Sequence, residues 1–359
     1  MAQLVYYGPG EALCEVGFQG ESDEKADVST AVTPVITFKY LRSLTIRANE
    51  NVQSGYFVNG GTGPNRNTIW KGSHSAEATM SFWIPKDLDQ ATPMEVWMLK
   101  NGVDGSSSVS ESTQDTYTVP DSTNEYGVHY LNAITLEAGW NKTSNVIGQR
   151  VTGAVCKKMT VHLEEDQPIL ITQEYIAYQA SMQIAFAAGT LTEASEAHFT
   201  WGDVSIAYGA AGASAAIDNI TMLDFSIEHI LMELKDLNNT TSTRCTTAFP
   251  VHRRVIGGTI RFNLETAAGN GQDLWESVFN DASGASTPTE GVTLKDIFVT
   301  LYQSSSYNIV FQLHDVVLGE ISSELQGETI PSVTLPFTAT ACILIFKILG
   351  TVSAPTGWD

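Results

Sequence analysis

The chain has 359 residues, of which 43% are hydrophobic and only 16% are charged, and its formal net charge is −21. This length allows two domains that each bury a core. Affinity for nucleic acid comes mainly from lysine and arginine side chains that neutralise phosphates. The balance of 19 basic against 40 acidic residues therefore argues against a tight DNA- or RNA-binding protein. The same repulsion argues against binding to an anionic membrane surface.

The first half is predicted to be mainly β-structure with one helix. Alternation of apolar and polar residues predicts strands, and a possible Asp cap followed by an apolar face predicts the helix. Glycines and aromatic residues in 50–70 predict a long loop. The expected elements are an N-terminal arm (1–35) with one short strand, strands at 36–49 and 76–85, a helix at 87–100, and strands near 128–140, 150–163 and 168–178.

The second half is predicted to follow the same order. The expected elements are a strand within 219–234, a loop at 236–254, a strand at 255–264, a helix at 271–280, and strands at 293–303, 307–318 and 328–349. Small, flexible segments at 187–197 and 209–216 lie between the halves. We therefore expect two domains, 1–186 and 187–359.

An internal repeat supports this division. Residues 153–177 lie over residues 315–339 without a gap at a shift of 162, and residues 79–84 lie over residues 259–264 at a shift of 180. A polar insertion in the first copy, 103–125, accounts for the difference. The repeat predicts tandem duplication of a β-sandwich or β-barrel with one flanking helix.

No motif for catalysis, metal binding or cofactor binding stands out. The chain has no HExxH, Walker, GxSxG or EF-hand pattern, and its seven histidines are scattered. The acidic cluster Glu164–Asp166 fits a calcium ligand set, a glycosidase carboxylate or a solvated hairpin turn. Its counterpart, 326–328, keeps only one acid, which favours the turn. We therefore expect neither an enzyme nor a cofactor-binding protein.

Targeting and cysteine patterns add little. The N-terminus lacks the features of a signal peptide, and the most apolar run, 339–349, is too short to span a bilayer. The four cysteines are far apart in sequence, so buried free thiols are expected at Cys14, Cys156, Cys245 and Cys342.

The N-terminal sequence YGPGEA (7–12), leading to VGFQG (16–20), resembles the start of tail tube proteins of long-tailed bacteriophages and archaeal viruses. The order of elements and the closing hairpin at 157–177, with its copy at 316–339, are similar as well. The resemblance implies a small β-sandwich or barrel whose subunits form rings that stack into a hollow tube. Because this chain carries two such units, it implies trimeric rings with pseudo-sixfold symmetry.

The resemblance also implies partners and a location. The chain would assemble with itself and with tape measure, tail terminator and baseplate proteins, in the host cytoplasm and then in the virion tail. Viral DNA would pass through an acidic lumen without specific binding, and no membrane is involved.

The N-terminal arm, the linker and the loops 49–75 and 236–254 are the segments expected to reach another subunit or ring. The insertion 103–125 is expected to decorate the outer surface or to make a stacking contact. The candidate contact residues are Tyr7, Phe18, Tyr56, Phe57, Trp70, Leu237, Phe249 and Arg253.

Two other functions fit the composition. One is another virion or extracellular β-module, such as a capsid, baseplate or adhesin component, which needs no stacked rings. The other is a carbohydrate-active enzyme, which needs two carboxylates in a cleft with aromatic walls.

Overall fold

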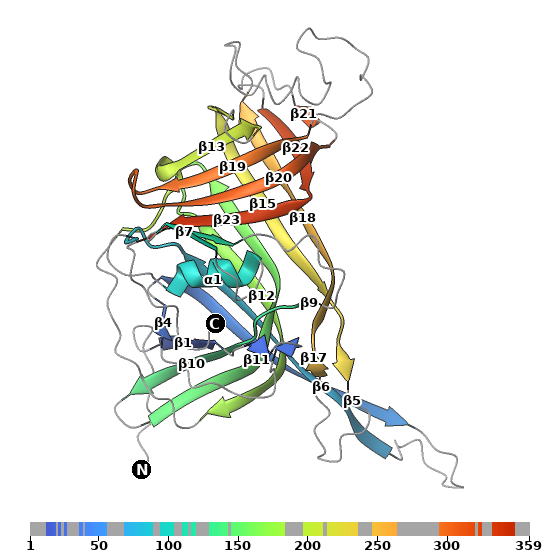
Figure 1. Ribbon diagram of the computed structural model, residues 1–359. Helices are drawn as coiled ribbons and strands as arrows, with labels where there is room; N and C mark the ends of the chain where they lie inside the picture. Colours follow the sequence, from blue (N-terminus) through green and yellow to red (C-terminus); the bar gives the residue numbers. More distant parts are fainter. Residues whose placement is uncertain are drawn as a thin grey trace.

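The computed structural model of the chain is mainly antiparallel β-structure (Figure 1), as predicted. In the part of the chain that it describes, one α-helix is present. The described residues are 12–18, 21–22, 25–26, 36–38, 40–55, 68–88, 94–103, 110–113, 116–119, 129–142, 145–183, 197–210, 214–235, 246–263, 294–319, 322–324 and 332–348.

The first half contains the helix and twelve of the strands. They are β1 (Ala12–Phe18), β2 (Glu21–Ser22), β3 (Lys25–Ala26), β4 (Ile36–Thr37), β5 (Leu41–Gly55), β6 (Thr68–Trp83), α1 (Met94–Val103), β7 (Ser110–Thr113), β8 (Thr116–Val119), β9 (His129–Tyr130), β10 (Ile134–Lys142), β11 (Asn145–Glu164) and β12 (Leu170–Gln183).

The described residues of the second half form eleven strands and one short 3-10 helix. They are η2 (Trp201–Asp203), β13 (Val204–Gly209), β14 (Ala215–Ala216), β15 (Ile220–Leu231), β16 (Leu234–Lys235), β17 (Thr246–Ala248), β18 (Pro250–Asn263), β19 (Lys295–Tyr302), β20 (Asn308–Leu318), β21 (Ser322–Glu324), β22 (Ser332–Ala339) and β23 (Ala341–Lys347).

In each half of the chain the strands pair one after another in a continuous series, which we call a circuit. In the N-terminal circuit the order is β4-β1-β10-β11-β12-β6-β5, and the two end strands β4 and β5 are consecutive in the chain, separated by residues 38–40. The C-terminal circuit runs β14-β13-β19-β20-β22-β18-β15, with β23 also beside β20. Its end strands β14 and β15 are likewise consecutive, separated by residues 217–219. Period-two alternation turns apolar side chains inward on these strands, and they pack into one continuous core.

The two circuits share their register as well as their order. The β6–β12 pairs Trp83–Leu170 and Ala76–Ala177 recur in β18–β22 as Asn263–Ser332 and Ile256–Ala339. The recurrence corresponds to shifts of 180 (263 minus 83) and 162 (332 minus 170), which are the two shifts of the sequence repeat.

The irregularities of the ladders recur too. The register of β5 on β6 slips between Leu41 and Ser43, and that of β15 on β18 slips between Ile220 and Met222. These positions differ by 179 residues (220 minus 41), and the same shift relates β4 to β14. A bulge inserts one extra residue and bends its strand. The strands of the two circuits are therefore matched residue by residue over these ladders.

Several predicted boundaries change. The predicted loop at 50–70 is strand in its described residues, because β5 continues to Gly55 and pairs with β6 from Thr68 onward, whereas residues 56–67 lie outside the described residues. The predicted loop at 236–254 likewise contains β17 and the first residues of β18. The ladder supplies each of these polar segments with backbone hydrogen bonds, which outweighs their weak strand propensity.

Other predicted elements are shorter or divided. The helix predicted from residue 87 begins at Met94, since Pro93 disfavours helical geometry in the residue before it. The strand predicted at 328–349 is divided at Thr340 into β22 and β23. Within the predicted linker 209–216, β14 pairs with β13. The helix predicted at 271–280 lies outside the described residues.

The insertion 103–125 does not only decorate the first circuit. It includes the β7–β8 hairpin, and β8 pairs with β23 of the C-terminal circuit from Val119–Leu344 to Thr116–Lys347. The sequence places the insertion between elements of the first half, but its hydrogen-bonding partner belongs to the second.

Candidate assembly surface

The two circuits meet at a seam formed by β11 and β15. These strands pair antiparallel over seven residues, from Lys158–Glu228 to Glu164–Met222. The inward side chains of the seam are all buried, with exposed fractions of 1% or less, and those at its centre are Val161 and Phe225. Phe225 also meets Phe311 edge to face, with ring centroids 5.4 Å apart. The seam therefore combines a continuous ladder with a closed apolar layer.

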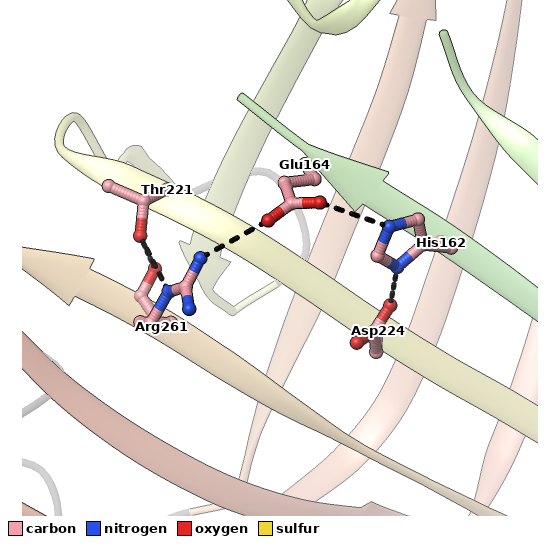
Figure 2. A network of polar contacts seen from close by, with 5 residues as sticks. All are labelled: His162, Glu164, Thr221, Asp224 and Arg261. Atoms are coloured by element: carbon pink, nitrogen blue, oxygen red, sulfur yellow. Dashed lines mark hydrogen bonds and ion pairs between the residues drawn. The ribbon is translucent and has the colours of Figure 1, made fainter. Parts of the chain in front are cut away.

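A chain of polar contacts covers the outward side of the seam (Figure 2). His162 on β11 pairs through Nδ1 with Asp224 on β15, and its Nε2 lies 3.5 Å from Glu164 Oε2. Arg261 on β18 lies with Nη2 3.5 Å from Glu164 Oε1, and its Nε donates to Thr221 Oγ1 at 3.2 Å. The network joins three strands, namely β11 of the N-terminal circuit and β15 and β18 of the C-terminal circuit.

The helix α1 also joins the circuits. On its N-terminal-circuit side, Gln173 Nε2 donates to the carbonyl oxygen of Met98 at 2.6 Å, and the Tyr175 hydroxyl donates to Gln173 Oε1 at 2.7 Å. Trp97 meets Phe346 on β23 of the C-terminal circuit edge to face, with ring centroids 6.0 Å apart. The helix therefore packs between the two halves.

His229 on β15 adds a buried polar contact to the helix. Arg254 Nε donates to His229 Nδ1 at 3.2 Å, so Nδ1 accepts, and Nε2 then donates to the carbonyl oxygen of Gly102 at 3.1 Å. Both contacts need one tautomer of the neutral ring, in which the proton is on Nε2.

Across the seam, eight strands form one continuous sheet in the order β5-β6-β12-β11-β15-β18-β22-β21. Each half of the chain contributes four of them, with β21 adding to β15, β18 and β22 of the C-terminal circuit. In the described part of the chain, residues Leu41–Ala48 of β5 pair only with β6, and β21 pairs only with β22. The sheet therefore ends in an edge at both sides. In Figure 1 β21 lies at the top, whereas the β5–β6 hairpin extends to the lower right.

The outward face of this sheet carries charges of both signs that lie opposite one another. Lys158 stands in register between Glu174 on β12 and Glu228 on β15, and Arg47 on β5 stands opposite Glu77 on β6. Opposite charges directly across an antiparallel pair stabilise it. The negative charge of the whole chain is therefore not concentrated on these described positions.

The acidic cluster Glu164–Asp166 lies at the β11–β12 turn, where Asp166 has a φ of 62°. Glu164 is occupied by His162 and Arg261, as described above. Among the described residues, no group of three or more His, Cys, Asp or Glu side chains is arranged to hold a metal ion. The turn interpretation is confirmed.

The described thiols are buried. Cys14, Cys156 and Cys342 are free thiols in the interior. Burial raises the pKa of Cys342 to about 12, and it raises the pKa of Cys156 further. Burial also raises the pKa of the Tyr175 hydroxyl. Because a thiolate is the reactive form, these cysteines are poorly suited to act as nucleophiles.

Of the predicted contact residues, two have described side chains. Phe249 is 2% exposed and packs with Leu131, Ala133 and Val155, so it contributes to the core of its own chain. Arg253 is exposed on β18. The side chains of Phe18 on β1 and Trp70 on β6 are not described, and Tyr7, Tyr56, Phe57 and Leu237 lie outside the described residues.

The edge residues of β5 and β21 were missed by the sequence analysis, which placed contacts in loops. The signal for them is the constant shift between the repeats: the counterpart of β5 is β15, and β15 is paired on both sides.

No protein-family model matches the chain, and no curated protein matches it in sequence. No helix in the described residues is long and apolar enough to cross a membrane.

Proposed function

We propose that this chain is a structural virion protein that assembles into closed rings, which stack into a hollow tail tube. The observation that carries the proposal is the seam between two circuits of identical register within one chain. A head-to-tail interface of this kind generates a ring when its rotation closes. A ring also removes the exposed sheet edges that otherwise lead to uncontrolled association.

The sheet order supports a tube wall built from this sheet. Each half of the chain supplies four neighbouring strands, so each chain adds an eight-stranded segment that, among the described strands, has one edge at either side. Three chains per ring would repeat the seam as a pseudo-sixfold arrangement of circuits. In this proposal each circuit is one copy of a tandemly duplicated tail-tube unit.

The outward face fits a passage for DNA. Two of its cations, Lys158 and Arg47, face carboxylates in register, which leaves them less available to neutralise phosphates, and lasting DNA contacts depend on such neutralisation. In this proposal DNA passes freely because the charges that line the tube are balanced, and not because the lining is uniformly acidic. Tape measure, terminator and baseplate proteins would be the partners at the ends of the tube.

Negative-stain electron microscopy of the purified protein, over a range of salt and protein concentrations, tests the proposal. We expect hollow rings or tubes of constant diameter, with three chains per ring in class averages. Monodisperse monomers under all conditions, with or without the other tail proteins, would instead favour a non-stacking β-module of the virion or cell surface.

A further inference from the structure

The strands at the two ends of the sheet are counterparts of the seam strands, and among the described strands each has a partner on one side only. Within the chain, β11 of the N-terminal circuit pairs with β15 of the C-terminal circuit. The counterpart of β15 is β5, and the counterpart of the end of β11 is β21, because the pairs of β21 on β22 repeat those of β11 on β12 at the shift of 162. These two strands are the edges of the eight-stranded sheet.

The pairing of β21 shows how close this correspondence is. Thr160–Thr172, Val161–Ile171 and His162–Leu170 in the N-terminal circuit become Ser322–Thr334, Ser323–Val333 and Glu324–Ser332 in the C-terminal circuit. In β11 the three residues Thr160–His162 are at the centre of the seam with β15. The equivalent residues of β21 have no second partner among the described strands.

We propose that β21 of one copy pairs antiparallel with β5 of the next copy in the register of the internal seam. Thr160–Ser226, Val161–Phe225 and His162–Asp224 then transfer to Ser322–Arg47, Ser323–Ile46 and Glu324–Thr45 between chains. The partner is thus a second copy of this chain, and this inference deepens the ring proposed above by assigning its residues.

Burial on β5 supports an occupant at this edge. The inward residues of β15 at the seam, Leu223, Phe225 and Ile227, are all buried. Their β5 counterparts Leu44 and Ile46 are only half-buried, and Ala48 is exposed. Since both strands carry apolar residues at the same inward positions, the difference is what a missing neighbouring strand leaves.

The charges support a complementary partner rather than a symmetric one. In the internal seam Lys158 lies between two carboxylates, Glu174 and Glu228. At the edge, among the described strands, the ladder places one carboxylate opposite Arg47, Glu77 of β6. In the proposed register Glu324 faces Thr45, two residues from Arg47 along β5, so β21 brings an acidic residue to the position diagonal to Arg47.

Paired cysteines test the register directly. Residues facing each other in an antiparallel ladder have Cα atoms about 4.5–5.5 Å apart, which lies within the range of disulfides. We would combine Arg47→Cys with Ser322→Cys, which face each other in the proposed register, and replace Cys245 by serine throughout. After oxidation at assembly concentration, we expect a ladder of covalent multimers on a non-reducing gel, ending at the number of chains in the ring.

The internal seam supplies the matched control. Thr160→Cys with Ser226→Cys places the same chemistry at the equivalent pair within one chain, so the product should remain a monomer. Arg47→Cys with Ser323→Cys shifts the register by one residue and turns one side chain to the other face. We expect at least about tenfold less cross-linking from this offset pair, and circular dichroism verifies the fold of each variant.

The outcomes separate this inference from the proposed function. Rings in the microscope without cross-linking above the single-cysteine level would overturn the β21–β5 pairing but leave the tube. A covalent ladder from the matched pair without rings or tubes would support the pairing and overturn the tube. Equal cross-linking by the matched and offset pairs would overturn the register, and neither rings nor a ladder would overturn both proposals.

Discussion

Strands β15 and β5 have equivalent places in the two circuits and the same bulged register on their neighbours, yet they differ in burial. β15 is paired on both sides, by β18 and β11, and its inward residues are buried. Over Leu41–Ala48, β5 is paired within the described residues by β6 alone. The comparison shows what one neighbouring strand contributes, because fold, register and sequence pattern are otherwise matched.

Truncating the inward side chains of Phe225 and Ile46 should give the largest difference in the free energy of unfolding. Phe225→Ala removes a buried ring that packs on Phe311, and we expect it to lower the free energy of unfolding by about 3–5 kcal/mol. Ile46→Ala on the half-buried edge should cost about 1 kcal/mol in the dilute monomer. Urea unfolding at low protein concentration measures both, and equal losses would contradict the comparison.

A second difference between the two circuits concerns a glycine on β18, the strand beside β15. Gly258 on β18 corresponds to Ala78 on β6, but a Cβ at Gly258 would lie 2.0 Å from the carbonyl oxygen of Asp224 on β15. We expect Gly258→Ala to destabilise the protein by about 1–3 kcal/mol. Gly202→Ala is the control, because a Cβ there would lie 3.9 Å from Thr200 Oγ1, an ordinary contact, and it should be neutral in the same unfolding assay.

The hydrogen bonds of Gln173 and Tyr175 near α1 depend on polar side chains that the C-terminal circuit lacks at the equivalent positions. Tyr175 and Gln173 correspond to Phe337 and Leu335 in the C-terminal circuit. Tyr175→Phe leaves Gln173 Oε1 without this donor, and we expect a loss of about 1–2 kcal/mol. Gln173→Leu combined with Tyr175→Phe removes both partners, and thermal unfolding should show a smaller loss than the sum of the single changes. Additive losses would show that the two side chains act separately.

The smallest effect concerns the ion pair between Lys86, after β6, and Asp203, at the start of the C-terminal circuit. Burial alone would raise the pKa of Asp203, but hydrogen bonds from Lys86 at 2.5 Å and from Thr200 outweigh it and hold the pKa below its ordinary value. Because the folded-state pKa is lowered, the stabilisation is present at neutral pH and is lost as the pH falls through that pKa.

Asp203→Asn should therefore lower the melting temperature slightly at pH 7, and the difference from the unmodified protein should shrink toward pH 3. Lys86→Met is the matched control from the other partner. A difference that grows on acidification would show that Asp203 is not stabilised as a carboxylate.

The sequence by itself determined the β-class of the fold, the Glu164–Asp166 turn and the two shifts that relate corresponding ladders. These features are local or periodic: alternation turns side chains to one face, and a turn at the end of a hairpin has its own chemistry. The shift is constant because strands with the same place in the fold need the same pattern of apolar residues, even where one has Phe225 and the other Ile46.

The tertiary structure alone decided which strands are neighbours across the halves. Alternation on β11 or β5 shows which residues face inward, but it carries no information about which strand supplies the next hydrogen bonds. The β11–β15 seam, the β8–β23 crossing and the extension of β5 into the polar segment 50–55 all depend on such long-range pairing. Backbone groups make these bonds whatever the side chains are, so local sequence does not reveal them.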